Sequence, residues 1–490
     1  MTQSAERQRD NVSESGPSGR SMALRGSIWT FVGYGGSQLL RLGSNLVLAW
    51  LLFPGAFGLM ALVNVFMQGL QMFSDIGLGP NIIRNRRGLE PSFLNTAWTI
   101  QILRGLGLWL VSCLLAYPVA QFFSANDPMA GSLMTLIPVA ALVAIIGGFN
   151  STGIFLLNRS MNIGRLTGLE LISQLVSTLV MIGWAMLWPS VWALVAGNLA
   201  ASLAKLFLSH RWNPGPPNRL KWERESLHDL FHFGKWIFLS TLVTFLAGNL
   251  DRIMLGKSLP LAELGVYTIA MTLARVTIHV SDRLSSTVIY PLLARLQDNP
   301  TRVVEACLRA RQPVLWLSGA VCVGFALIAP LFFTSLYDPR YAQAGAISQW
   351  LALYVWSHVL NSTMDRIPLT LGHPRQLFNA NVLTTLSMLL ALPGYTHFGL
   401  PGFILGMTVA NLVAHVYLVA NLPFGRKQMW WQGAWFSAGL LIYALPLVVL
   451  LRADSIVASP WLHGLAALLG AAPLTLFGAW KIWRAVRAPK

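Results

Sequence analysis

Residues Phe233 to Ala270 read FGKWIFLSTLVTFLAGNLDRIMLGKSLPLAELGVYTIA, and this stretch decides the fold. An apolar run closes with an Asp-Arg pair, a short connector holds Pro260, and a new apolar run opens at Gly265. Long apolar runs joined by a few turn-forming residues are typical of two membrane-spanning helices. The stretch therefore predicts a helical hairpin in a membrane.

The same pattern occurs about 200 residues earlier, in Leu46 to Ala61, LVLAWLLFPGAFGLMA. The connector there also holds a Pro and a following Gly, and in both copies the second run ends in Pro-x-x-x-Arg (Pro80 to Arg84, Pro291 to Arg295). A repeat of this length, with several helices in each unit, is typical of transporters built from two related helix bundles. The alternative is that the chain has no internal repeat and that the likeness is only local, because any two membrane hairpins share Pro and Gly at their turns.

The composition is that of a polytopic membrane protein. Of 490 residues, 54% are hydrophobic and 11% are charged, which is too apolar for a soluble protein with one core and a polar surface. The net charge of +17 does not indicate nucleic-acid binding, because Lys and Arg lie in short loops between apolar runs. The three cysteines form no CxxC pair and no even-numbered framework, so we expect no disulfide, metal site or other cofactor.

Apolar segments of 18 or more residues mark spanning helices, and they predict an all-α membrane protein of about fourteen spans. The segments are roughly 27–51, 55–79, 93–118, 130–157, 166–188, 190–209, 230–256, 262–292, 312–335, 342–368, 375–396, 400–421, 431–451 and 461–483. Residues 1–25 are polar, and the long run that follows them has no small-residue cleavage site, so we expect a disordered tail and a retained first span.

These spans predict two pseudo-symmetric six-helix lobes, 26–209 and 230–425, with helices 13 and 14 and a tail in 426–490. The basic, Pro-rich segment 210–229 is expected to link the lobes on the cytoplasmic side. Basic residues gather in alternate loops, so the positive-inside rule predicts a multi-pass protein with both termini in the cytoplasm.

No catalytic machinery is evident, and we do not expect an enzyme. A membrane glycosyltransferase or polymerase usually needs a large external domain, whereas the first external connector is only Phe53 to Ala56. Gly256-Lys257-Ser258 has the ending of a P-loop, but Asp251 stands where that motif needs its first glycine. A helix end with an interfacial lysine explains these three residues.

Polar side chains at helical spacing within apolar spans should face the protein interior or a water-filled cavity, because lipid exposure is costly for them. Four spans carry such stripes: Tyr34, Gln38, Arg41 and Asn45; Asn64, Gln68, Gln71 and Asp75; Arg275, His279, Asp282 and Arg283; His358, Asn361 and Asp365. The alternative is that these residues join helices through hydrogen bonds, and that Asp251 and Arg252 form a structural ion pair.

Arg41, Arg104 and Arg275 lie near the bilayer midplane, and we expect them to face one cavity. Guanidinium groups match phosphate oxygens bidentately, so the predicted substrate carries phosphate or pyrophosphate. The candidate substrate-binding residues are Gln38, Arg41, Asn45, Asn64, Gln68, Arg104, Arg275 and Arg283. The candidates for coupling transport to an ion gradient are Asp75, Asp251, His279, Asp282 and Asp365, with His279 as a proton relay.

Two stretches resemble the oligosaccharide flippase (polysaccharide transporter, Wzx-type) family of the MOP superfamily. One is Phe73-Ser-Asp-Ile-Gly-Leu-Gly-Pro80 with Leu94-Asn-Thr-Ala97, and the other is Phe233-Gly-Lys with Asp251-Arg-Ile-Met-Leu-Gly256. The resemblance covers most of residues 25–425. It implies a MATE-like pair of six-helix lobes around a central cavity, which moves an undecaprenyl-pyrophosphate-linked oligosaccharide across the bacterial inner membrane by alternating access.

The resemblance also implies partners, namely membrane lipids and the glycosyltransferases and polymerase of an exopolysaccharide or lipopolysaccharide pathway. Two functions within the same superfamily remain open, a lipid II flippase and a cation-coupled drug exporter. A drug exporter usually has twelve spans and accepts organic cations, which fits midplane arginines poorly. A lipid II flippase is harder to separate from the first interpretation on charge alone.

Overall fold

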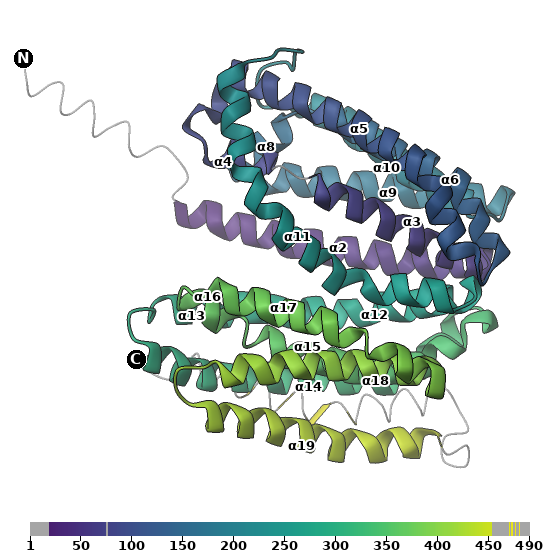
Figure 1. Ribbon diagram of the computed structural model, residues 1–490, viewed down its shortest axis with the longest axis vertical. Coiled ribbons are helices and arrows are strands. Elements are labelled where there is room, and N and C mark those ends of the chain that lie inside the picture. Colours follow the sequence, from purple (N-terminus) through teal and green to yellow (C-terminus); the bar gives the residue numbers. More distant parts are fainter. Residues whose placement is uncertain are drawn as a thin grey trace, which may run out of the picture.

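The computed structural model describes residues 19–74 and 77–452, together with five isolated positions between 470 and 480. All elements in this part of the chain are helical. Figure 1 shows them in two groups, which lie together at the right of the view and spread apart toward the left. We call residues 19–211 the N-lobe and residues 224–452 the C-lobe.

The N-lobe begins with two long helices joined by a two-residue turn, and Pro54 starts the second of them, where a missing N–H costs nothing. Its elements are α2 (Gly19–Leu51), α3 (Pro54–Phe73), α4 (Leu78–Arg84), η1 (Arg86–Leu89), α5 (Pro91–Ser124), η2 (Pro128–Ser132), α6 (Leu133–Ala140), α7 (Leu142–Gly148), α8 (Gly153–Arg159), α9 (Ile163–Leu187) and α10 (Trp192–Arg211).

The C-lobe repeats this opening, with a long helix, a turn of two residues and a second long helix. Its elements are α11 (Arg224–Ser258), α12 (Leu261–Leu284), η3 (Ser285–Ile289), α13 (Tyr290–Ala294), α14 (Pro300–Leu336), η4 (Pro339–Tyr341), α15 (Gln343–Ser362), α16 (Arg366–Thr370), α17 (Pro374–Met388), α18 (Ala391–Ala420) and α19 (Arg426–Arg452). α18 contains a sharp break, because Gly399 within it has a φ of 63°, outside the helical range.

Nine helices in the described ranges are long and apolar enough to cross a membrane. The expected spans that fall on α2, α11, α15 and α17 also form helices, but these four helices are not both long enough and apolar enough to be counted among the nine. In α2, for example, the polar side chains of Gln38, Arg41 and Asn45 lower the mean hydropathy of the helix. The expected span 461–483 lies largely outside the described residues, so the count of fourteen stays a prediction.

The two repeat-related hairpins pack directly against each other. A Cβ atom built on Gly58 would lie 2.1 Å from the Leu261 carbonyl oxygen, and one built on Gly265 would lie 1.9 Å from the Pro54 carbonyl oxygen. The same interval of 207 residues separates the two glycines and the two carbonyls, so the contact is reciprocal. Only glycine lets the backbones approach this closely.

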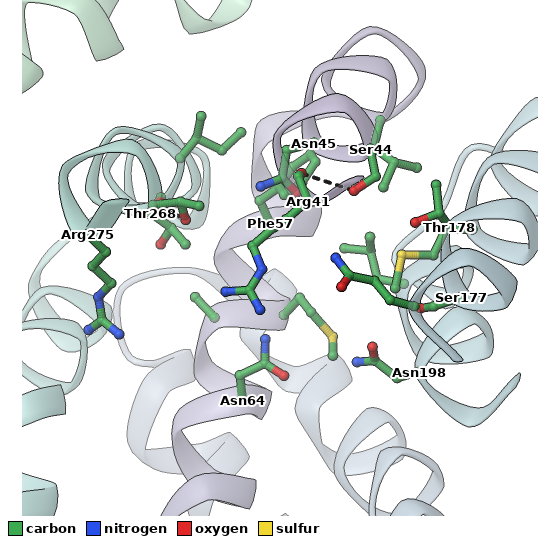
Figure 2. A pocket seen from close by; sticks show the side chains of 18 of the residues that line it. Arg41, Ser44, Asn45, Phe57, Asn64, Ser177, Thr178, Asn198, Thr268 and Arg275 are labelled. Carbon is green, nitrogen blue, oxygen red and sulfur yellow. Dashed lines mark hydrogen bonds between the residues drawn. The ribbon is translucent and has the colours of Figure 1, made fainter. Parts of the chain in front are cut away.

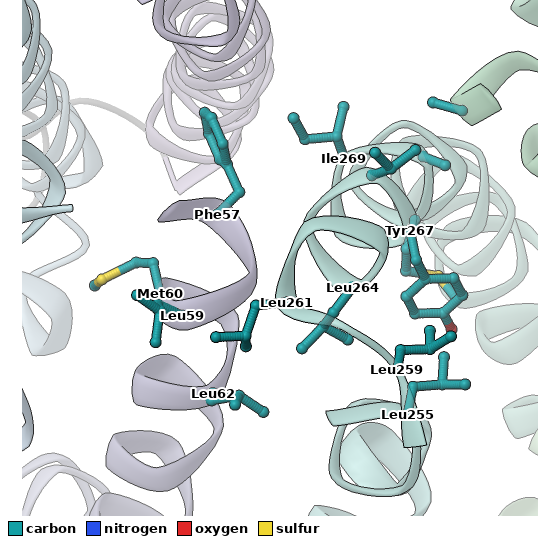
Figure 3. Close-up of a cluster of buried hydrophobic side chains, with 14 of the residues drawn as sticks. Phe57, Leu59, Met60, Leu62, Leu255, Leu259, Leu261, Leu264, Tyr267 and Ile269 are labelled. Carbon is teal, nitrogen blue, oxygen red and sulfur yellow. The ribbon is translucent and has the colours of Figure 1, made fainter. Parts of the chain in front are cut away.

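Apolar side chains surround this glycine contact and form the main core of the molecule. Figure 3 shows Leu62 of α3 on the side that faces Leu261 and Leu264 of α12 across the lobe boundary. Leu261 is 1% exposed and Leu264 is 0% exposed. The two lobes are therefore joined by a dry, close-packed interface at one end, which we call the closed end.

The helix expected over 130–157 is not continuous. It forms α6, α7 and α8, with an irregular segment between Gly148 and Gly153. The side-chain nitrogen of Gln101 lies within 3.1 Å of the carbonyl oxygens of Gly147, Gly148 and Asn150. Broken helices survive at membrane depth where protein groups satisfy the freed backbone, and Gln101 does so here.

The expected linker 210–229 is shorter than predicted and lies against the N-lobe. α10 continues to Arg211 and α11 already begins at Arg224. The backbone N–H of Arg219 donates to Asn95 Oδ1 (2.8 Å), and Arg87 forms an ion pair with Glu223 (3.1 Å). We call this end of the molecule, opposite the closed end, the basic end.

Candidate functional site: a cationic cavity between the lobes

A cavity of about 610 Å³ lies between the two lobes. Residues of α2, α3, α9 and α10 line it from the N-lobe, and residues of α11 and α12 line it from the C-lobe. Figure 2 shows Arg41 of α2 pointing toward Asn64 of α3, with Thr178 and Asn198 nearby and Arg275 on the facing helix. The cavity therefore gathers polar side chains from both repeats.

The lining is cationic. Arg41, Arg252 and Arg275 line the cavity together with His279, and no Asp or Glu is among its lining residues in the described part of the chain. Arg41 lies ten residues before the end of α2, or about 15 Å along the axis, which is half the thickness of a hydrocarbon core. Such a cavity favours an anion.

The two C-lobe guanidinium groups that line this cavity, those of Arg252 and Arg275, form few hydrogen bonds with the protein. A terminal nitrogen of Arg275 donates to the Gly248 carbonyl oxygen (3.1 Å), and a terminal nitrogen of Arg252 contacts Asn249 Oδ1 at 3.4 Å. The buried Nε of Arg252 has no hydrogen-bond partner among the described residues. Terminal guanidinium nitrogens with spare hydrogen-bonding capacity beside a polar cavity are suited to a ligand with several acceptor oxygens.

Arg252 is a cavity residue that the sequence did not predict. The Asp-Arg pair suggests an ion pair, but Asp251 turns into the core, is 4% exposed and accepts a hydrogen bond from the Tyr267 hydroxyl (2.8 Å). The sequence repeat could have indicated Arg252. At the 207-residue interval between the two hairpins, Arg252 is the counterpart of Asn45, which belongs to the polar stripe in the first span. The same interval places Arg275 on Gln68.

Other lining residues were also missed, because they carry small or neutral polar groups that do not stand out in a sequence. They are Ser44, Gln174, Ser177, Thr178, Asn198, Thr268 and Thr272. Of the predicted substrate-binding residues, the cavity contains Gln38, Arg41, Asn45, Asn64 and Arg275. Hydroxyl and amide groups around a cationic centre can bind the hydroxyl-rich part of a substrate.

Arg104 does not share this cavity, and that expectation is wrong. It lines a second cavity of about 550 Å³ inside the N-lobe, together with Gln101 and Lys205. Its Nε donates to Ser74 Oγ (2.9 Å) and a terminal nitrogen donates to the Gln71 carbonyl oxygen (2.9 Å). α5 turns this polar face toward its own lobe, so depth in the membrane did not determine which cavity the residue faces.

The coupling candidates gather in part in a third cavity, of about 390 Å³, on the C-lobe side, which we call the C-lobe chamber. Arg275 and His279 line both this chamber and the central cavity, so the two spaces share a wall. Asp365 lines the chamber, as does His358, whose Nε2 lies 3.3 Å from Asp282 Oδ1. A carboxylate and histidine cluster therefore lies directly behind the cationic lining.

The remaining candidates fall elsewhere. Gln68 lines the C-lobe chamber rather than the central cavity. Arg283 lies at the end of α12 and lines none of these three cavities. Asp75 lies outside the described residues. Within the described ranges, no cluster of His, Cys, Asp and Glu is suited to hold a metal ion.

Curated relatives are similar over part of the chain. Teichuronic acid biosynthesis protein TuaB of Bacillus subtilis (strain 168) is 20% identical over 307 residues, which cover 62% of this chain and 62% of TuaB. Lipopolysaccharide biosynthesis protein WzxC of Escherichia coli (strain K12) is 21% identical over 295 residues, which cover 58% of this chain and 57% of WzxC. The alignments therefore span about three fifths of each relative.

Solved structures share the fold. Lipid II flippase MurJ in an inward closed conformation superposes with a TM-score of 0.72 at 14% identity, covering 95% of this chain and 100% of that one. A multidrug resistance MATE family transporter of the MOP superfamily, in an inward-facing conformation, gives a TM-score of 0.59 at 16% identity and covers 82% of this chain and 96% of that one. The predicted all-α, MATE-like fold is confirmed.

A family model described as polysaccharide biosynthesis protein matches residues 47–345, which is more than half of the chain. The matched range includes the connectors of both hairpins, the glycine contact at the closed end, and Arg252 and Arg275 of the central cavity. The chain belongs to this polysaccharide biosynthesis protein family.

Proposed function

We propose that this protein is a flippase, which moves a lipid-linked oligosaccharide carrying phosphate or pyrophosphate across the bacterial inner membrane. The observation that carries the proposal is the cavity between the lobes, which Arg41, Arg252 and Arg275 all line without a lining carboxylate in the described part of the chain. A guanidinium group at the depth of Arg41 costs about 2.5 to 3.5 kcal/mol on insertion scales, so a binding role explains it better than packing alone.

The mechanism follows from the arrangement of the lobes. The head of the substrate enters between them from the basic end, where they are spread apart, and its phosphate oxygens accept hydrogen bonds from the arginines. Amide and hydroxyl groups of α9 and α10, such as Ser177 and Asn198, receive the sugars. Rocking of the lobes then closes the basic end and opens the other, as in alternating access.

We further propose that the basic end faces the cytoplasm and that both chain termini lie there, in accordance with the positive-inside rule. Glycosyltransferases that assemble the repeat unit would then supply the substrate at the basic end, and a polymerase would take it up outside. Asp365 and His358, which line the C-lobe chamber, and Asp282, which contacts His358, couple an ion gradient to this movement in our proposal. Its support is that Arg275 lines both the chamber and the central cavity.

The test is a deletion mutant, followed by analysis of its lipid-linked intermediates. We expect surface polysaccharide to be lost while complete repeat units accumulate on their lipid carrier, and the intact gene to restore export. Accumulation of lipid II instead would identify a lipid II flippase. Absence of any assembled repeat unit would contradict the proposal and indicate an enzyme that acts earlier.

A further inference from the structure

Two loops at the closed end have the same local structure. Asp127-Pro128 and Asp338-Pro339 stand 211 residues apart, and each begins a 3-10 turn, η2 and η4. In both, Oδ1 of the Asp accepts a hydrogen bond from the N–H two residues later, at 2.9 Å. The loops are therefore repeat-related copies of one capped turn.

Each loop contacts the hairpin of the opposite lobe. Asp127 of the N-lobe accepts a hydrogen bond at its second oxygen from the N–H of Leu261, the first residue of α12 (3.0 Å). Beside it, the Asn126 side-chain amide donates to the Lys257 carbonyl oxygen. In the other direction, the Tyr341 hydroxyl of the C-lobe donates to the carbonyl oxygen of Leu52, between α2 and α3 (3.3 Å).

The two loops differ in their contacts for a simple reason. Leu261 corresponds to Pro54 at the 207-residue interval, and Pro54 has no N–H to donate. Asp338 therefore cannot cap α3 as Asp127 caps α12. It pairs instead with Arg340 in its own loop, at 2.8 Å, and the hydrogen bonds from Arg340 hold the pKa of Asp338 below its usual value. Arg340 in turn reaches the Trp50 carbonyl oxygen of the N-lobe only at 3.4 Å, a longer contact than that of Asp127 with Leu261.

Asp127 thus places a carboxylate of one lobe at the N-terminus of a helix in the other. A carboxylate that accepts from a helix N-terminal N–H is stabilised both by the hydrogen bond and by the helix dipole. Both oxygens of Asp127 are used, one for Met129 of its own loop and one for Leu261 of the other lobe. Separation of the lobes at this end must break the second bond.

We infer that Asp127 is a latch that adds to the packing of the closed end and helps to hold it shut, and that the repeat-related Asp338 is not a latch. The inference rests on the proposed rocking of the lobes. A cap of this kind changes a conformational equilibrium roughly two- to thirtyfold, so its loss should raise the population open at this end by that factor. Asp127→Asn would keep an acceptor for only one of the two N–H groups, because these groups bond to different carboxylate oxygens and the amide replaces one of them with NH2.

The experiment measures access to the cavity and needs no substrate. The three cysteines are replaced by alanine, and Ser44→Cys provides one thiol in the cavity lining. A membrane-impermeant maleimide is then applied to right-side-out and to inverted membrane vesicles. We expect Asp127→Ala to speed labelling from the closed-end side about two- to thirtyfold, and Asp338→Ala, which loses the same cap within its loop, to change it less than about twofold.

A second variant removes the bond from the other partner. Leu261→Pro deletes the N–H and copies Pro54, and proline is tolerated at the first position of a helix. Leu261 is also a buried core residue, so Leu261→Ala, which loses the side chain but keeps the N–H, is its control. Leu261→Pro should speed labelling beyond Leu261→Ala by about the factor that Asp127→Ala gives alone, and Asp127→Ala should add little when Leu261→Pro is already present. Equal effects of Asp127→Ala and Asp338→Ala, or no effect of Asp127→Ala and Leu261→Pro, would overturn the inference. Because transport is not measured, these outcomes are independent of which lipid-linked substrate is carried.

Discussion

At the scale of single residues, Asp251 and Arg252 show how adjacent charges can take separate roles. Neighbouring residues on a helix do not share a face, so the pair divides between the core and the cavity. Asp251 stabilises the packing of α11 against α12 through Tyr267, while Arg252 becomes one of three cavity cations. In the sequence these two residues suggest an ion pair. In the structure Asp251 lies in the core and Arg252 lines the cavity.

The three cavity arginines should act together on the substrate. Replacement of Arg41, Arg252 or Arg275 by Gln removes a charge-assisted bond of about 1.5 to 3 kcal/mol and should weaken binding roughly ten- to a hundredfold. The measurement is binding of undecaprenyl pyrophosphate to the purified protein in lipid nanodiscs. Lys at each position should restore binding only in part, because it keeps the charge but loses the bidentate geometry.

Arg104→Gln is the matched control for this series, since Arg104 also lies within a long apolar span but lines a different cavity. This variant should bind within about twofold of the wild type, because it removes no group from the central cavity. An equal loss in Arg104→Gln would place the N-lobe cavity on the substrate path. Unchanged binding in all three central variants would return these arginines to a role in helix packing.

Much of the central cavity could be predicted from helical spacing. The period of 3.6 residues places Gln38, Arg41 and Asn45 on one face of α2, and the structure directs that face into the cavity. The period does not say which neighbour a polar face meets. Arg104 was misplaced for this reason, because the partners of α5 are fixed by packing between segments far apart in the sequence.

At the scale of elements, Gln101 is one of the side chains that stabilise the break between α7 and α8. Gln101→Leu would leave carbonyl oxygens at the break without this donor, which costs about 1 to 3 kcal/mol when such groups are buried. We expect a lower melting temperature of the purified protein in detergent. Gln121→Leu, at the exposed end of the same helix α5, should leave the melting temperature unchanged, and equal melting of both variants would contradict this role of Gln101.

The glycine contact between α3 and α12 sets how closely the lobes approach. Ala at Gly58 or Gly265 would overlap a backbone carbonyl, and overlap of this kind costs about 1 to 3 kcal/mol in a packed interior. Each variant should therefore speed maleimide labelling of the cavity from the closed-end side. Gly107→Ala, where a Cβ meets nothing within 4 Å, is the control, and a similar increase in Gly107→Ala would show that the effect is not due to the contact.

The hairpins themselves were predictable, because long apolar runs and a Pro and Gly connector are local signals. The break at residues 149–152 was not, and the reason is physical. Its freed carbonyls are satisfied by Gln101 and Trp98, about fifty residues earlier in the chain. A local apolar run predicts a continuous helix unless such distant partners are known.

At the scale of the whole molecule, the orientation in the membrane stays a prediction with a direct test. Reporter fusions at Ala125 and Gly394 should be external, and fusions at Arg211 and Lys427 should be cytoplasmic, because basic loops alternate along the chain. Alkaline phosphatase activity and green fluorescent protein fluorescence distinguish the two sides. A reversed result at any one of the four positions would break the predicted order of spans.

The repeat explains the shape but not the chemistry of the molecule. Gly58 and Gly265 are equivalent and pack against each other, whereas Asn45 and Gln68 correspond to Arg252 and Arg275. The sequence repeat could thus predict two related lobes, while the uneven distribution of charge between them became visible only in the cavity. The C-lobe supplies two of the three arginines, so it should dominate recognition of the anionic head group.

The course of α11 limits how the lobes can move. The segment that precedes α11 forms hydrogen bonds and an ion pair with the N-lobe, and the last turns of α11 lie in the core of the closed end. Between these two attachments α11 is one continuous helix of 35 residues, or about 52 Å. Helices curve smoothly with radii of about 60 to 100 Å, so a rod of this length can bend through roughly 30 to 50° without losing its hydrogen bonds. α11 can therefore bend elastically along its whole length and store elastic energy when the lobes rotate, so this helix needs no hinge residue.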